Sequence, residues 1–119
     1  MECFKLRFSI LLSLIIFIFY TSSYSQKISN SYVSDSIQFW SIVNEHKAVL
    51  YKNPDSALLI LQKGTKFIEK PLNIKLKASY LLYKGNIFRI KNQVTVAFPY
   101  FNEAYGLFSS LGDKKNCNQ

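Results

Sequence analysis

The chain has 119 residues, a formal net charge of +8 and a hydrophobic fraction of 49%. This length allows one small domain, and one histidine and two cysteines exclude a disulfide-rich fold and predict no metal or cofactor site. A basic chain could suit nucleic acid, an anionic membrane surface or acidic peptides. However, no basic run exceeds Lys114-Lys115, and the scattered lysines favour a solvated helical surface and no nucleic-acid partner.

The first 25 residues are expected to form a signal peptide. Basic residues precede an apolar run over 9–20, and Ser23 and Ser25 are small residues at the positions that a signal peptidase reads. Cleavage is expected between Ser25 and Gln26. As a helix, the run would be about 18 Å long, less than the roughly 30 Å of a bilayer core. We therefore expect an exported, periplasmic or secreted protein, with a membrane-tethered structural protein as the alternative if the signal stays uncut.

Residues 26–33 are rich in polar residues and are expected to form a flexible leader. A first helix is expected to follow, from about residue 34 to Lys52. Its apolar residues advance by three to five positions and would make one buried stripe. The residues of this stripe are Ile37, Trp40, Val43, Ala48 and Tyr51.

The clearest helix start in the chain is Asn53-Pro54-Asp55. An Asn side chain can accept from the first exposed amides, Pro has no amide to leave unpaired, and Asp favours the positive end of the helix dipole. This second helix is expected to end near Lys70, because Pro71 cannot continue it.

Two more helices are expected in the last third of the chain. The third runs from about Asn73 to Lys91, where Asn92 can take a left-handed turn. The fourth starts between Gln93 and Thr95 and ends at Leu111-Gly112. Pro99 falls within its first two turns, where an early helix start would predict a kink.

Small and aromatic residues of these two helices recur at a fixed spacing. They are Leu81, Gly85, Phe88, Ala97, Phe101 and Ala104. Helices cross closely only where side chains are small, so Gly85 and Ala97 would let two backbones approach while Phe88 and Phe101 fill the space beside them. Any helical hairpin can use a small residue in this way, but the full pattern resembles the tetratricopeptide repeat (TPR). A fainter copy lies upstream, around Ala57.

The resemblance implies an all-α, right-handed array of antiparallel helix hairpins, with about four helices after the signal peptide. It implies a degenerate hairpin over 34–70 and a second hairpin over 71–112. Residues 113–119 would then be a truncated link to a next repeat, and we expect the chain to be the N-terminal part of a longer array. With no following repeat, Phe101, Tyr105 and Phe108 would be partly exposed and available for self-association.

The function implied by the resemblance is protein binding without catalysis. Asn86, Arg89 and Lys91 would contribute to a peptide groove, although the residues alone are more typical of a solvated helix surface. No nucleophile, acid–base pair or phosphate-binding loop indicates an enzyme. Exported arrays of this kind also resemble the sensor regions of bacterial two-component histidine kinases and of repeat-linked regulators, which gives a second possible function.

Overall fold

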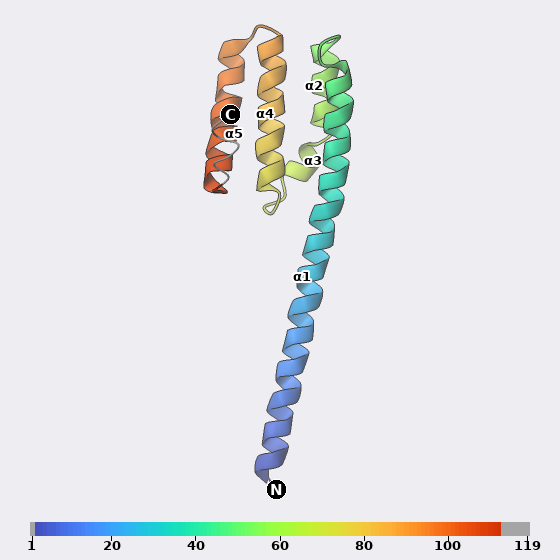
Figure 1. Ribbon diagram of the computed structural model, residues 1–119, viewed down its shortest axis with the longest axis vertical. Coiled ribbons are helices and arrows are strands. Elements are labelled where there is room, and N and C mark those ends of the chain that lie inside the picture. The colour runs from blue at the N-terminus through green and yellow to red at the C-terminus, as the bar shows by residue number, and fades with distance from the viewer. Residues whose placement is uncertain (1, 113–119) are drawn as a thin grey trace. The chain divides into compact units, whose positions relative to one another are not determined.

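The computed structural model describes residues 2–112, and all regular structure within them is α-helical (Figure 1). Its helices are α1 (Glu2–Val49), α2 (Pro54–Gln62), α3 (Thr65–Ile68), α4 (Ile74–Ile90) and α5 (Val94–Ser110). The all-α class is confirmed for these residues. The expected link over 113–119 lies outside them, as do the side chains of Ser25 and Gln26 at the expected cleavage site. The chain divides into two units, Met1–Ser34 and Asp35–Gln119.

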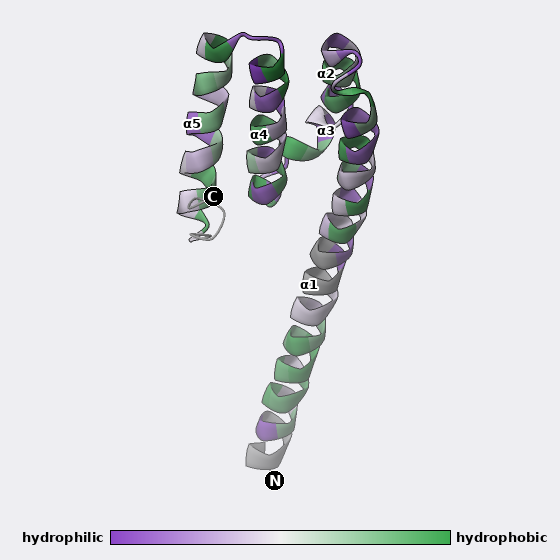
Figure 2. Ribbon diagram, turned by 45° about the horizontal axis from the view of Figure 1, so that its top comes forward, coloured by the Kyte–Doolittle hydropathy of each residue, from purple (hydrophilic) through white to green (hydrophobic). Residues whose placement is uncertain are grey.

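The N-terminal unit is helical over its described residues. The flexible leader expected over 26–33 is instead part of α1, because this segment contains no Pro or Gly to stop a helix. Figure 2 shows the apolar run as a green band in α1, and its large side chains are exposed. Within the described part of the chain, no helix combines the length and the hydropathy needed to span a membrane.

The second unit buries its core between the end of α1 and the helices that follow. On α1 the buried residues are Asp35, Phe39, Val43 and His46, spaced by four, four and three positions, and the buried Leu50 follows directly after the helix. The expected stripe is therefore wrong except at Val43. Ile37, Ala48 and Tyr51 are exposed, and Trp40 is 37% exposed. The remaining core residues include Ala57, Leu61, Phe67, Leu76, Tyr80 and Ile87.

The second expected helix is divided in two by a turn at Lys63-Gly64. Its start is confirmed, because the Asn53 side chain accepts a hydrogen bond from the Ser56 amide at 3.1 Å. Its expected course to Lys70 is wrong. A Cβ on Gly64 would lie 3.3 Å from the Phe39 ring, so this backbone packs directly on α1. That close contact accompanies the turn, which ends α2 and precedes α3.

The last two helices form an antiparallel hairpin and lie side by side in Figure 1. Asn92 takes the expected left-handed conformation, with φ of 60°, and Gly112 does the same at 71°. At the end of α4 the Gln93 amide donates to the Phe88 carbonyl at 2.8 Å, which closes the helix. Pro99 is the sixth residue of α5, where its ring removes one backbone hydrogen bond.

Candidate interaction surfaces

The contact between α4 and α5 is tightest at Gly85. A Cβ on this glycine would lie 2.9 Å from Cε1 of Phe101, closer than van der Waals contact allows. Ala97 and Ala104 are buried on the same hairpin, as is Leu81. The six residues of the repeat spacing therefore all lie on the two facing helices. The Phe88 ring of α4 stacks on Tyr100 of α5, with ring centroids 5.6 Å apart.

The three residues expected in a peptide groove each have a partner within the chain. Arg89 donates to the Asn86 side-chain oxygen through Nε at 3.0 Å and through Nη2 at 2.8 Å. The side chains of Asn86 and Arg89 therefore form a hydrogen-bonded pair within α4. Lys91 follows the end of α4, forms an ion pair with Asp55 of α2, and places its Nζ 5.8 Å from the centre of the Phe88 ring.

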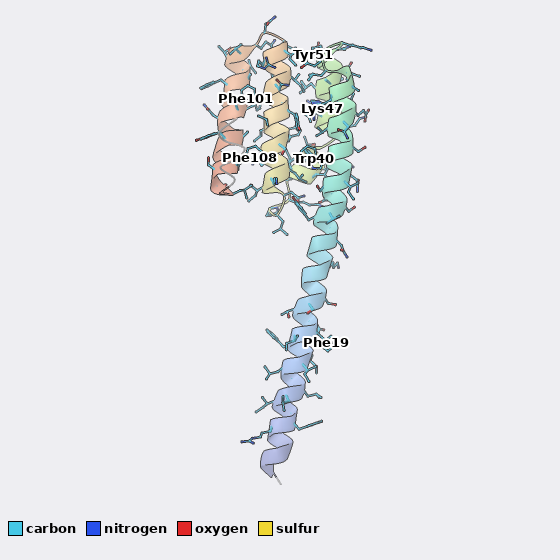
Figure 3. All side chains as sticks on the ribbon, in the orientation of Figure 1. Phe19, Trp40, Lys47, Tyr51, Phe101 and Phe108 are labelled. Atoms are coloured by element: carbon cyan, nitrogen blue, oxygen red, sulfur yellow. The ribbon has the colours of Figure 1, made fainter. Side chains whose placement is uncertain are left out.

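A cluster of aromatic and basic side chains joins α1 to α4 instead. Trp40 packs edge-on against Tyr83 with ring centroids 6.2 Å apart, and Nζ of Lys47 lies 5.1 Å from the centre of the same ring. Figure 3 labels Trp40 and Lys47 on α1. The sequence reasoning missed this cluster, although the seven-residue separation of Trp40 and Lys47 places them on one helix face.

The outer face of α5 is apolar and exposed. Val94, Phe98 and Tyr105 are 63%, 61% and 59% exposed, and their spacing of four and seven residues places them on one side of the helix. The one charged residue of α5 is Glu103, which pairs with Lys77 at 3.9 Å. We call the surface formed by Val94, Phe98 and Tyr105 the α5 outer face.

This face differs from the expected strip of Phe101, Tyr105 and Phe108. Phe108 is only 7% exposed, and Phe101 is half-buried against Gly85. The reason is helical geometry: Phe108 follows Ala97 and Ala104 at the seven- and four-residue spacing that faces α4. Tyr105 is exposed and Phe101 is partly exposed, as expected, so the expectation is wrong only at Phe108.

Ion pairs occupy most of the carboxylates of the second unit. Besides the two pairs above, Lys63 pairs with Glu45 at 3.4 Å, and Lys70 donates to Asp35 at 2.7 Å. The Asp35 carboxylate also accepts from the buried amide of Asn73 at 3.0 Å. The hydrogen bond from Lys70 holds the pKa of Asp35 below its ordinary value. These carboxylates therefore link the helices through ion pairs, and several remaining lysines are surface cations.

One buried polar side chain lacks any hydrogen-bond partner. His46 is 0% exposed, and neither of its ring nitrogens meets a donor or acceptor. Burial, followed by the charge of Lys47, lowers the pKa of His46. Over residues 2–112 no three His, Cys, Asp or Glu side chains gather as they would to hold a metal ion.

Comparisons with known proteins give no match to this chain among protein-family models, curated proteins or solved structures. Functional reasoning therefore starts from the surfaces of the molecule itself.

Proposed function

We propose that this chain is an exported, non-catalytic protein-interaction module built from TPR-like helix hairpins, and that it associates with a second copy of itself through the α5 outer face. The observation that carries the proposal is the exposure of Val94, Phe98 and Tyr105 on a helix with a single charged residue. The close contact of Gly85 with Phe101 supports the TPR-like hairpin, because this is the crossing that the repeat spacing implies.

Electrostatic repulsion between positively charged copies favours the α5 outer face over other surfaces as the contact between them. Each full-length copy carries a formal charge of +8, and the loss of Glu2, Lys5 and Arg7 on cleavage lowers it by only one, so two copies repel each other wherever their lysines approach. The α5 outer face contains no cation, and the nearest charge on that helix, Glu103, is already paired. Repulsion is therefore weakest when α5 of one copy meets α5 of the other.

The expected affinity is modest. Covering about 200 Å² of apolar surface on each copy is worth about 5 kcal/mol per copy. Association costs at least about 4 kcal/mol in lost translational and rotational freedom, and more as side chains become ordered. The balance is at most about 6 kcal/mol, which corresponds to a dissociation constant of about 40 μM or weaker.

Sedimentation of the full chain and two single-residue variants tests this function. Phe98→Asp places a charge on the α5 outer face, whereas Tyr51→Asp places the same charge on an exposed residue outside it. Any association through the apolar run of α1 is common to all three proteins. We expect Phe98→Asp to weaken association at least tenfold and Tyr51→Asp to leave it unchanged. Equal behaviour of the two variants would contradict the proposal.

Export is tested by the mass of the protein recovered outside the cytoplasm. Cleavage between Ser25 and Gln26 predicts a product that begins at Gln26. Recovery of the exported protein with Met1 intact would exclude a cleaved signal and favour the membrane-tethered alternative.

A further inference from the structure

His46 lies where a neutral imidazole fits and a charged one does not. The side chain is fully buried, and both Nδ1 and Nε2 lack hydrogen-bond partners. Its ring meets the Tyr83 ring of α4 edge-on, with centroids 5.4 Å apart. A buried polar group without a partner is costly to the fold, and a buried charge without a partner is far more costly.

The groups around His46 offer no negative charge to stabilise a protonated imidazole. From α1 the neighbouring Lys47 adds positive charge, and its Nζ lies over the same Tyr83 ring. From α4 the titratable group that faces the imidazole is Tyr83 itself. α2 and α3 contribute apolar residues to this core, namely Ala57, Leu61 and Phe67. The closest carboxylate in sequence, Glu45, pairs with Lys63.

We propose that His46 is a proton-sensitive switch in which uptake of one proton in a mildly acidic medium opens the packing of α1 against α4. The imidazolium would need an anion or acceptors for two N–H groups, and the folded core offers neither. The ring reaches water and a counter-ion only when α1 moves away from Tyr83. Protonation and opening are therefore coupled, and the contact between the two helices becomes dependent on pH.

The direction of the effect follows from proton linkage. The pKa of His46 is lowered from its ordinary value of 6.5 in the folded state, so the open state binds the proton more readily. The stability contributed by the neutral ring is complete above pH 6.5 and is lost as the pH falls from 6.5 toward the lowered value. One extra proton bound on opening raises the unfolding equilibrium constant by up to about tenfold for each pH unit in this range.

The composition allows the pH dependence of unfolding to be assigned to single residues. His46 is the one histidine in the chain, and Trp40 is the one tryptophan. Asp35, whose pKa is lowered from 3.8, acts at much lower pH, so the range from 6.5 to about 5 belongs to His46. Trp40 and His46 both contact Tyr83, and Trp40 fluorescence therefore reports the opening directly.

Urea unfolding of the full chain, followed by Trp40 fluorescence between pH 7.5 and 5.0, tests the switch. We expect the midpoint urea concentration to fall steadily below pH 6.5 in the native chain. His46→Leu and His46→Phe should keep a constant midpoint over the same range, and Lys47→Ala should retain the fall because burial is the main cause. A constant midpoint in the native chain, or an unchanged fall in the His46 variants, would overturn the proposal.

A second measurement keeps the test decisive if the variants fail to fold. The Cε1–H resonance of His46 can be followed by NMR in the native chain as the pH is lowered. The switch predicts that the folded-state signal keeps its neutral position below pH 6.5, while the signal of an unfolded population appears and grows. A folded-state signal that titrates near pH 6.5 would show that the ring accepts a proton in place and would refute the coupling.

Discussion

At the scale of single residues, the contact of Gly85 with Phe101 shows how a side chain is excluded by its neighbour. Gly85 lies within α4, and a Cβ there would lie 2.9 Å from the Phe101 ring. Gly106 of α5 provides a natural comparison, because a Cβ at that residue meets nothing within 4 Å. Both glycines are helical, so they differ in their surroundings and not in their backbone.

The two glycines should therefore respond in opposite directions to substitution. Gly85→Leu forces the Phe101 ring aside and should lower the free energy of unfolding by about 1–3 kcal/mol. Gly106→Ala should raise it by up to about 1 kcal/mol, because alanine has the higher helix propensity. Urea unfolding of both variants measures the difference. If Gly85→Leu proved as stable as the native chain, the ring would be free to move and the helix crossing would not depend on glycine.

The repeat spacing identified the Gly85 contact, but the same reasoning misplaced Phe108. Gly85 and Phe101 could be paired from sequence because each matches a known position of a repeat. The burial of Phe108 depends on the direction in which α5 faces α4, and an apolar residue alone does not give that direction. The absence of hydrogen-bond partners at His46 could not be predicted either, since the sequence does not show which residues will surround a single histidine.

At the scale of elements, local stop signals predicted helix ends well. Asn92 and Gly112 take left-handed conformations, and α4 and α5 end beside them as expected. The turn after α2 was missed because it accompanies the contact of Gly64 with Phe39, a residue distant in sequence. The helical course of residues 26–33 was missed for another reason: polar composition suggested a leader, although no residue there breaks a helix.

The start of α2 offers a test at this scale. Asn53→Ala removes the side-chain oxygen that accepts from the Ser56 amide and should cost about 1 kcal/mol of unfolding free energy. Asn53→Gly should lower the free energy of unfolding by only about a few tenths of a kcal/mol, because water can reach the exposed amides. Thermal unfolding of the two variants, compared by circular dichroism, gives the ranking. Equal stability of Asn53→Ala and the native chain would mean that the cap does not limit this helix.

At the scale of the whole molecule, the proposed function depends on what the α5 outer face contacts. A hairpin stabilised internally by Gly85 and Phe101 still leaves Val94, Phe98 and Tyr105 exposed. The repulsion between copies that each carry a charge of +8 restricts self-contact to surfaces with few lysines. The α5 outer face meets that condition, and this is why we assign it the interaction.

The most direct measurement is site-specific photo-crosslinking of the purified full chain, with a benzophenone side chain in place of Phe98 and, as the control, in place of Tyr51. The account predicts a product of twice the chain mass from residue 98, with crosslinked peptides that map to α5 of the other copy. The control should give little of this product. Equal yields from the two residues, or crosslinks from residue 98 that map to the apolar run over 9–20, would contradict the assignment of the α5 outer face as the interaction surface.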